Sequence, residues 1–221
     1  MSTKNQHLVV TAGPTREALD PVRFLSNQSS GTFGYEIARV AVRRGHTVTL
    51  ISGPTALKPP AGVEFIPVIT ARQMGEAIHT HFARAQALIM AAAVADYRPK
   101  KLNISKIKKT KGLDKEGGWA LELVPNPDLV AEASSKRRPG QIVVGFSLDS
   151  RAQWIAEAKR KLREKGLDLM VACRLEEGKG PFGDAPLSVA FVVPGDVTPE
   201  IHRGEKPALA RQLLDKLKPL C

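Results

Sequence analysis

The chain has 221 residues, of which 43% are hydrophobic and 25% are charged. These proportions are ordinary for a globular protein with one large domain, so collagen-like, disordered and disulfide-scaffold classes are excluded. Lys and Arg number 33 against 22 Asp and Glu, which gives a formal net charge of +11. An excess of this size favours an anionic partner, whether nucleic acid, a lipid surface or a small polyphosphate.

The sequence carries no signal for a membrane or for secretion. Its longest apolar run, 87–95, is well short of the ~20 residues that a membrane helix needs. The N-terminal residues lack the apolar region of a signal peptide. Cys173 and Cys221 are too few for a disulfide framework. We therefore expect a cytoplasmic protein that does not act on a membrane.

Buried strands alternate with amphipathic helices along most of the chain. Strands are expected at 8–11, 46–52, 63–68, 87–93, 142–146, 167–172 and 187–193. Helices are expected to begin at 31–34, at the capping box Thr70-x-x-Gln73, at Asn126-Pro-Asp128 and at Ser150-x-x-Gln153, and a last helix carries Leu209, Leu213, Leu214 and Leu217 on one face. This alternation predicts an α/β fold of the Rossmann-like, doubly wound type with a mostly parallel sheet.

The segment 97–125 breaks the alternation. It is rich in Lys and turn residues and holds one expected short strand, 119–124. Eight Lys and Arg lie between Asp96 and Glu116 against three acids, so +5 of the net +11 is concentrated there. We predict a single domain over residues 1–221 with a Lys-rich flap or arm at about 97–125.

The loop after the first strand is a candidate ligand site, because ligands of open α/β sheets bind beyond the carboxyl ends of the strands. It ends in Ser29, Ser30 and Gly31 at a helix N-terminus, where backbone amides and the helix dipole favour an anion. The loop lacks G-x-G-x-x-G, and the second strand ends at Gly53 without an acid for a ribose hydroxyl, which counts against NAD. An NAD(P)-dependent oxidoreductase stays open as the alternative function. A nucleic-acid-binding module is a second alternative, although few aromatic residues stand among the lysines to stack bases.

Seven motifs follow one another along the chain: Thr11-Ala-Gly-Pro-Thr, Asp20-Pro-Val-Arg-Phe, Ser26-Asn-Gln-Ser-Ser-Gly31, Ala91-Ala-Ala-Val-Ala-Asp-Tyr-Arg98, Lys106-Ile-Lys-Lys109, Asn126-Pro-Asp128 and Gly145-Phe146. In order and spacing they resemble the phosphopantothenoylcysteine synthetase domain of coenzyme A biosynthesis, over residues 7–217. The resemblance implies a ligase that condenses 4′-phosphopantothenate with L-cysteine. It implies a nucleotide triphosphate with Mg²⁺, CTP being favoured over ATP, and an acyl-nucleotidylate intermediate, with release of CMP and pyrophosphate. It also implies a homodimer and, for a free-standing synthetase, a separate flavin-dependent decarboxylase downstream.

The resemblance assigns roles to individual residues. It implies that Asn27 and Lys106 are catalytic, Asn27 by donating to the oxyanion of the second half-reaction and Lys106 by contacting the triphosphate. Arg23, Ser29, Ser30 and Gly31 are expected to bind the substrate phosphate. The nucleotide is expected to contact Met90, Ala91, Ala92, Asp96, Lys106, Pro127, Asp128, Leu129, Val130, Phe146, Lys161 and Lys165, with Arg160 as an alternative to Lys161. No metal site built from protein ligands is predicted.

The chain departs from the family pattern at three places. Ser147-Leu148-Asp149 stands where the family has Ala-Ala-Glu, and Cys173-Arg174 stands where the family has Asn-Asp. An Asn that is common in the family is missing near Asp184-Ala185-Pro186. By resemblance these positions lie on the base and ribose side, so they bear on nucleotide preference more than on the reaction.

Overall fold

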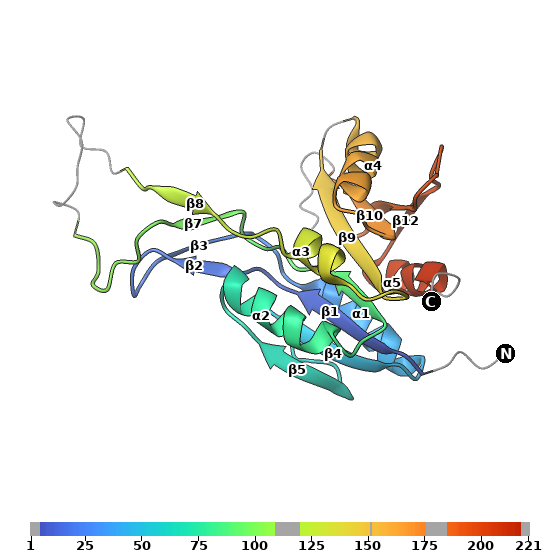
Figure 1. Cartoon of the computed structure of the whole chain (residues 1–221), viewed down its shortest axis with the longest axis horizontal. Coiled ribbons are helices and arrows are strands. Elements are labelled where there is room, and N and C mark those ends of the chain that lie inside the picture. Colours follow the sequence, from blue (N-terminus) through green and yellow to red (C-terminus); the bar gives the residue numbers. More distant parts are fainter. Residues whose placement is uncertain (1–4, 109–119, 151, 176–184, 218–221) are drawn as a thin grey trace.

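The fold is taken from a computed structural model, which describes residues 5–108, 120–150, 152–175 and 185–217 (Figure 1). Within these residues the core is an eight-stranded sheet with the order β12-β11-β10-β9-β6-β1-β4-β5. Its strands are β1 (His7–Ala12), β4 (Thr47–Ser52), β5 (Val63–Pro67), β6 (Ala87–Met90), β9 (Ile142–Asp149), β10 (Leu169–Arg174), β11 (Leu187–Val192) and β12 (Ile201–Gly204). The pairs from β5 to β10 are parallel, which confirms the Rossmann-like, mostly parallel sheet. β11 and β12 add an antiparallel edge, and β12 was not predicted.

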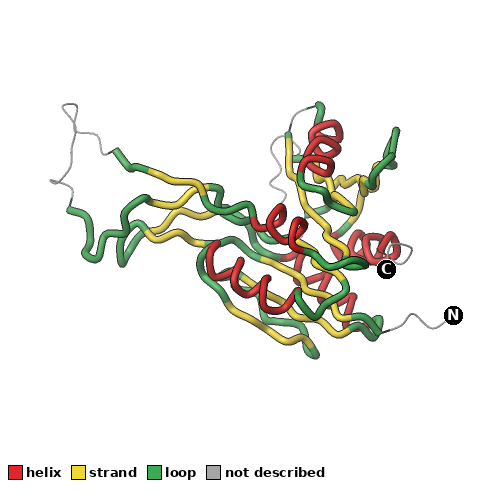
Figure 2. The backbone as a smooth tube through the Cα atoms, viewed as in Figure 1, coloured by secondary structure: helices red, strands yellow, loops and turns green. Residues whose placement is uncertain are grey.

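Helices cover both faces of the sheet (Figure 2). One face packs on α1 (Thr32–Arg43) and α5 (Lys206–Leu217), and the other on α2 (Ala71–Phe82), α3 (Leu129–Lys136) and α4 (Trp154–Glu164). β1 shows why both faces can be apolar: Leu8 and Val10 enter the cluster with α1 and α5, whereas Val9 enters the cluster with α2 and α4. In the described part of the chain no helix combines the length and hydropathy that a membrane crossing requires.

The predicted helix starts are correct for two helices and wrong for two. Gly31 precedes α1, and Thr70 forms the expected capping box with Gln73. α3 begins at Leu129 with Asp128 as its N-cap. The Asn126 side chain does not cap the helix, because it donates to Ala95 O (2.8 Å) and accepts from Arg98. α4 begins at Trp154 without a side-chain cap. Its expected cap, Ser150, directly follows β9, which runs three residues beyond the predicted end at 146 and so displaces the helix start.

Two short hairpins project from the sheet and form an arm, defined here as residues 16–26, 97–108 and 120–125 (Figure 1). β2 (Arg16–Ala18) pairs with β3 (Phe24–Ser26), and β7 (Tyr97–Pro99) pairs with β8 (Leu123–Pro125). The sequence predicted a loop for the first hairpin and one strand at 119–124 for the second. Three-residue strands are too short to show a period-two pattern, which explains both errors. Residues 109–119, with Lys109, Lys111, Lys115 and Trp119, lie outside the described residues.

The base of the arm is fixed to the sheet by backbone hydrogen bonds. Thr15 N donates to Ala93 O (3.2 Å), and Arg16 N donates to Ile69 O (2.7 Å). The buried carboxylate of Glu17 accepts from the Ala71 amide (2.8 Å) in the first turn of α2. The loops that leave β1 and β6 therefore enter the arm from defined positions.

Candidate active site

A cavity of about 690 Å³ lies where β6 and β9 end and α1 begins. This is the carboxyl edge of the parallel strands, where the sequence placed the ligand. Its lining comprises Asn27 to Gly34, Met90 to Asp96, Asn126 to Val130, Phe146 to Leu148, Lys165, Cys173, Leu187 and Lys206. Most of the predicted site residues are therefore brought together from five separate parts of the chain.

The N-terminus of α1 is shaped for close approach of an anion. Gly31, the N-cap, has a φ of 80°, a conformation that favours glycine, and it supplies no side chain to the helix end. The Thr32 amide in the first turn donates to Ser30 Oγ (3.4 Å). Ser29 Oγ accepts from the Gly31 amide (3.3 Å), and Ser30 Oγ lies 2.9 Å from Thr32 Oγ1. Backbone amides and hydroxyls thus line the cavity at the positive end of the helix dipole.

Asn27 lines the same cavity, but its amide is already engaged. Its Nδ2 donates to Ala93 O (3.1 Å) and to Val94 O (3.2 Å), both in the loop after β6. This amide therefore ties the loop before α1 to the loop before the arm. The expected oxyanion role requires it to exchange one of these bonds for the reacting oxygen.

The wall formed by 90–92 is held from beneath by Thr11. The Thr11 hydroxyl accepts from the Ala92 amide (3.1 Å) and lies 3.7 Å from Met90 Sδ. Phe146 lines the cavity and packs edge-to-face on Phe33, with ring centroids 5.4 Å apart. Small side chains on one wall and an aromatic ring on another leave room for a flat ligand.

Lys161 and Lys165 of the α4 region both contact groups of the cavity wall. Lys165 Nζ lies 2.8 Å from an Asp128 carboxylate oxygen, and Asp128 also caps α3 by accepting from Ala131 N (3.1 Å). Lys161 Nζ donates to the buried Ser147 hydroxyl (3.3 Å). Arg160 instead pairs with Glu157 and Glu164 on the exposed side of the helix. Lys161 does not itself line the cavity and also lies 3.6 Å from Glu157, but of the two residues it is the one bonded to the cavity wall.

Two predicted residues, Arg23 and Lys106, lie in the arm and do not line the cavity. The Arg23 guanidinium contacts Asp20 and the Ile107 carbonyl, and Lys106 is exposed. If either residue meets the ligand, the arm must bring it there, either to this cavity or to that of a second copy.

Lys206 is a site residue that the sequence did not reveal. It lines the cavity, is only 4% exposed, and donates to Ala185 O (3.0 Å). Its position in the first turn of α5 places the ammonium near the positive end of the helix dipole. A lysine at a helix start was the only signal in the sequence, and it is a weak one.

We predict that Lys206→Met weakens nucleotide triphosphate binding by about 10-fold to 100-fold, the loss expected for one hydrogen bond to a charged group. The charge is removed while the side-chain length is nearly kept. Lys216→Met, an exposed position on the same helix, is the control. Calorimetric titration with the triphosphate measures both variants, and equal affinity of the Lys206 variant and the parent protein would count against this role.

Cys173, one of the departures from the family pattern, faces the cavity as a buried thiol. Burial raises its pKa to about 12, and the nearby Lys206 lowers it by a smaller amount. The thiol therefore stays protonated at neutral pH and is a poor nucleophile.

The raised pKa of Cys173 has a consequence at high pH. Between about pH 9, where an unfolded thiol ionises, and about pH 12, the folded chain keeps a proton that the unfolded chain has lost. The free energy of unfolding should therefore fall more steeply with rising pH than in a Cys173→Ala variant. Urea unfolding from pH 8 to pH 10.5 measures this difference, and parallel curves for the two proteins would contradict it.

The site residues fit Mg²⁺ as an ion carried by the nucleotide. No group of three or more His, Cys, Asp or Glu is positioned to hold a metal anywhere in the described ranges. Asp96 and Asp128 are the carboxylates of the cavity lining. Because Mg²⁺ is commonly held by one or two carboxylates together with substrate phosphates, this donor set is sufficient.

Comparisons with known proteins agree with this geometry. Residues 3–220 match the family described as DFP, the DNA/pantothenate metabolism flavoprotein C-terminal domain. The chain is 41% identical over 220 residues to the coenzyme A biosynthesis bifunctional protein CoaBC of Mycobacterium tuberculosis, covering 95% of this chain and 51% of the relative. It is 40% identical over 211 residues to CoaBC of Bacillus subtilis, covering 94% and 48%. The chain thus spans about half the length of these curated relatives.

Solved structures agree with the fold. The crystal structure of the C-terminal domain of a CoaBC protein superposes with a TM-score of 0.80 at 32% identity, covering 100% of this chain and 98% of that one. A Cab2 mutant in complex with phosphopantothenate-cysteine superposes with a TM-score of 0.81 at 16% identity, which supports the fold alone; it covers 98% of this chain and 88% of that one. With the motifs, the cavity and these matches in agreement, the chain belongs to the DNA/pantothenate metabolism flavoprotein C-terminal domain family, the phosphopantothenoylcysteine synthetase family that its motifs indicated.

Proposed function

We propose that this chain is a phosphopantothenate–cysteine ligase that uses a nucleotide triphosphate, with CTP favoured, and serves coenzyme A biosynthesis. The observation that carries the proposal is the convergence on one cavity of an anion-binding helix N-terminus at Gly31 and the cations Lys165 and Lys206. A phosphorylated acid and a triphosphate need both features, because their like charges must be neutralised before they can approach. The names of the curated relatives, which refer to coenzyme A biosynthesis, support the same assignment.

The proposed reaction has two half-reactions. First, a carboxylate oxygen of 4′-phosphopantothenate attacks the α-phosphorus of CTP, and pyrophosphate leaves. The cysteine amine then attacks the acyl carbon, CMP leaves with the former carboxylate oxygen, and the amine loses a proton. Lys165, Lys206 and Lys106 lower the repulsion in the first step, and Asn27 donates to the oxyanion in the second. Mg²⁺ bound to the triphosphate supplies further charge neutralisation.

An Asn27→Asp variant should separate the two half-reactions. A carboxylate in place of the amide repels the developing oxyanion, and one such donor is typically worth ~10²–10³ in rate. We expect pyrophosphate to be released in a single burst while the acyl-nucleotidylate accumulates and little product forms. Gln28→Glu adds the same charge one residue away on the cavity wall and is the control. Normal turnover of Asn27→Asp with cysteine would rule out the role.

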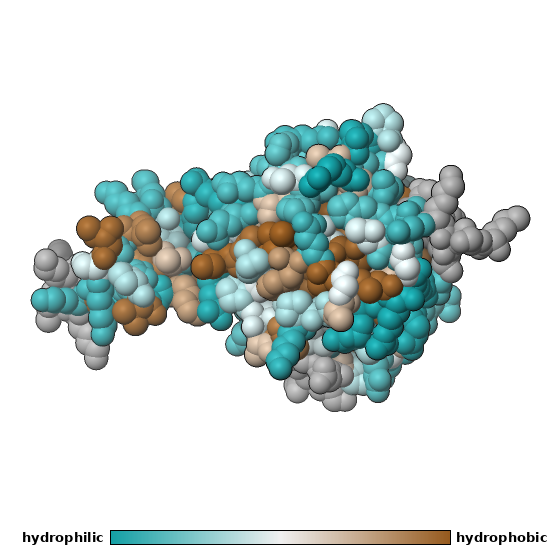
Figure 3. Space-filling model, turned by 90° about the horizontal axis from the view of Figure 1, so that it is seen from below, coloured by the Kyte–Doolittle hydropathy of each residue, from teal (hydrophilic) through white to brown (hydrophobic). Residues whose placement is uncertain are grey.

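We also propose that the chain works as a homodimer. The arm exposes large apolar side chains, among them Phe24, Tyr97 and Ile104, and Figure 3 shows apolar residues on the surface of the arm. Such a surface is typical of an interface. It suits a second copy whose arm brings Lys106 to the neighbouring site.

Mixing Asn27→Asp protein with Lys106→Ala protein should restore activity, because a mixed dimer holds one intact combination of site and arm. If activity did not recover after subunit exchange, the shared site would be contradicted.

The direct test of the proposed function is pyrophosphate release. With 4′-phosphopantothenate and Mg²⁺, we expect release with CTP and less with ATP, and continuous turnover only after cysteine is added.

Cys173→Asn, which introduces the amide common in the family, tests whether the cavity wall at Cys173 sets the preference between the two nucleotides. A flavin-dependent decarboxylase would consume the product. No pyrophosphate with any nucleotide would overturn the proposal. NADPH binding in its place would favour the oxidoreductase alternative, against which the missing ribose-binding acid already counts.

A further inference from the structure

The turn of the β2–β3 hairpin holds a carboxylate that reaches across to the segment carrying Lys106. We propose that Asp20 is a positioning residue, which latches residues 103–107 to the hairpin and thereby places Lys106. This inference rests on the proposed role of Lys106 in the ligase reaction. Asp20 is a buried carboxylate of the arm and does not line the cavity.

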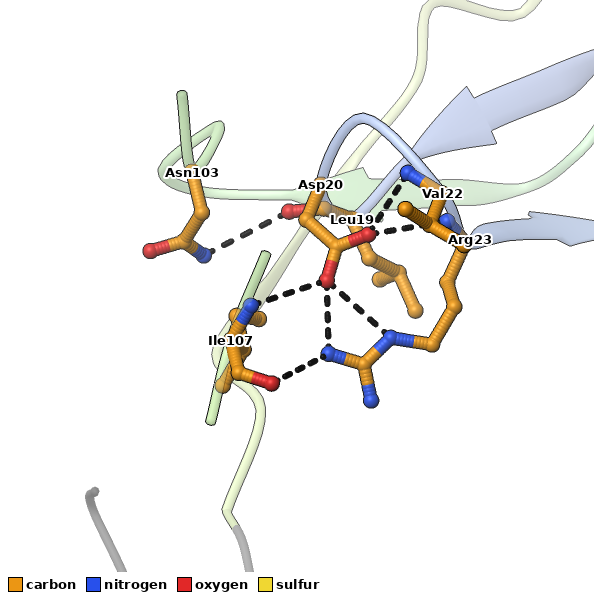
Figure 4. Close-up of polar contacts among 6 residues, drawn as sticks. All are labelled: Leu19, Asp20, Val22, Arg23, Asn103 and Ile107. Atoms are coloured by element: carbon orange, nitrogen blue, oxygen red, sulfur yellow. Dashed lines mark hydrogen bonds and ion pairs between the residues drawn. The ribbon is translucent and has the colours of Figure 1, made fainter. Parts of the chain in front are cut away.

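Asp20 accepts five hydrogen bonds although its side chain has no exposed area (Figure 4). Its Oδ1 accepts from the amides of Val22 and Arg23, each at 2.9 Å. Its Oδ2 accepts from Arg23 Nε (3.0 Å), Arg23 Nη2 (2.6 Å) and the Ile107 amide (3.1 Å). The guanidinium and these donors hold the pKa of Asp20 well below its ordinary range, so the carboxylate is ionised at neutral pH.

The two oxygens of Asp20 serve different segments. The Oδ1 bonds close the local turn, as an Asp often does in a hairpin connection. A turn needs nothing more, yet Oδ2 bonds a backbone amide 87 residues further along the chain. Arg23 completes the link from the other side, since its Nη2 donates to the Ile107 carbonyl (3.2 Å). Both backbone polar groups of Ile107 are therefore bonded to the hairpin.

A second anchor lies three residues before Lys106. The Asn103 amide and its Nδ2 both donate to the Leu19 carbonyl, at 3.3 and 3.4 Å. Among the described residues, the β7–β8 hairpin ends with the backbone bond of Lys100 to Glu122 (2.9 Å), and residues 100–108 belong to no helix or strand. Lys106 therefore lies between two points of attachment, Asn103 and Ile107, and the carboxylate of Asp20 governs the nearer one.

This arrangement also reinterprets Arg23, which the sequence assigned to the substrate phosphate. Its Nε and Nη2 are directed at Asp20 and at the main chain of the Lys106 segment. Arg23 thus helps to place the cation that meets the phosphate ligand, and a loss of activity in an Arg23 variant need not signal a lost phosphate contact.

Asp20→Asn is the sharpest test, because it keeps an oxygen for the turn but puts an NH₂ group where the Ile107 amide and Arg23 donate. We expect the variant to keep its melting temperature within a few degrees and its KM for cysteine, while kcat falls by up to about 10²-fold, the loss that small misplacement of a catalytic group can cause. Hydrogen exchange at residues 103–108 should become faster. Asn103→Ala, which leaves the turn untouched, should shift kcat and exchange in the same direction by less, and it covers the case in which Asp20→Asn fails to fold.

The double variant Asp20→Asn/Lys106→Ala distinguishes positioning from a general structural role. If Asp20 acts through Lys106, the double variant is no slower than Lys106→Ala alone. Additive losses, or a wild-type kcat for Asp20→Asn, would overturn the inference. A fully active Lys106→Ala would instead overturn the proposed role of Lys106, on which this inference depends. If that variant is inactive while Asp20→Asn is normal, only the latch is wrong.

Discussion

Lys106→Ala is expected to lower the rate of pyrophosphate release by about 10²–10³-fold, the usual loss when one preorganised charge is removed from a transition state. The carboxylate of the acid and the triphosphate carry like charges, and Lys106 is the cation that the family motif places on the arm. Nucleotide affinity should fall less than the rate, because Lys165 and Lys206 in the cavity lining remain. Rapid-quench measurement of the first turnover separates the two effects.

Lys101→Ala is the matched control for Lys106→Ala. Lys101 lies in the same arm segment, is exposed and carries the same charge, but it stands outside the Lys106-Ile-Lys-Lys109 motif. A loss in this variant equal to that of Lys106→Ala would show that the arm attracts anions by its overall charge alone. The specific role of Lys106 would then have to be abandoned.

Gly31→Ala is expected to lower the free energy of unfolding by about 2–5 kcal/mol and to abolish anion binding at α1. A φ of 80° costs a residue with a Cβ atom roughly 1–2 kcal/mol. The added Cβ would also lie 2.9 Å from Thr55 Cγ2 and 3.1 Å from the Gly13 amide nitrogen, and overpacking of this kind typically costs about 1–3 kcal/mol. Urea unfolding measures the first effect, and titration with pyrophosphate measures the second.

Gly45→Ala isolates the contribution of the backbone. Gly45 lies just after α1 with a φ of 83°, and a Cβ built there has nothing within 4 Å. Its loss should be limited to the ~1–2 kcal/mol of the left-handed conformation. An equal loss of unfolding free energy at Gly31 and Gly45 would mean that the loop before α1 relaxes around the new methyl group. The close packing around Gly31 would then not contribute to stability.

Much of the fold could be predicted because its signals are local. The apolar run of β1, the Thr70 capping box and the Leu stripe of α5 each appear within a few residues of sequence, and the structure contains all three. The hairpins of the arm and the antiparallel edge strand β12 could not be predicted. Their strands have three or four residues, and they are defined by partners that only the folded chain supplies.

The candidate site shows the same division. The motifs placed Asn27, Asp96 and Phe146 near a ligand, and the structure brings all three to one cavity. Lys206 was not predicted because an isolated lysine carries no motif, and its burial in the cavity wall beside Ala185 arises only in the folded chain. The bond between Asp20 and Ile107 joins positions far apart in sequence, so no local pattern indicates it.

The path of the carboxylate oxygen of the acid distinguishes an acyl-nucleotidylate from other intermediates. With ¹⁸O in the carboxylate of 4′-phosphopantothenate, CTP and cysteine, attack on the α-phosphorus predicts one ¹⁸O atom in the CMP released and none in pyrophosphate. Mass spectrometry of the nucleotide reads this outcome within a single reaction. Label in inorganic phosphate, or turnover that leaves CMP unlabelled, would contradict an acyl-nucleotidylate and with it the chemistry assigned to this cavity.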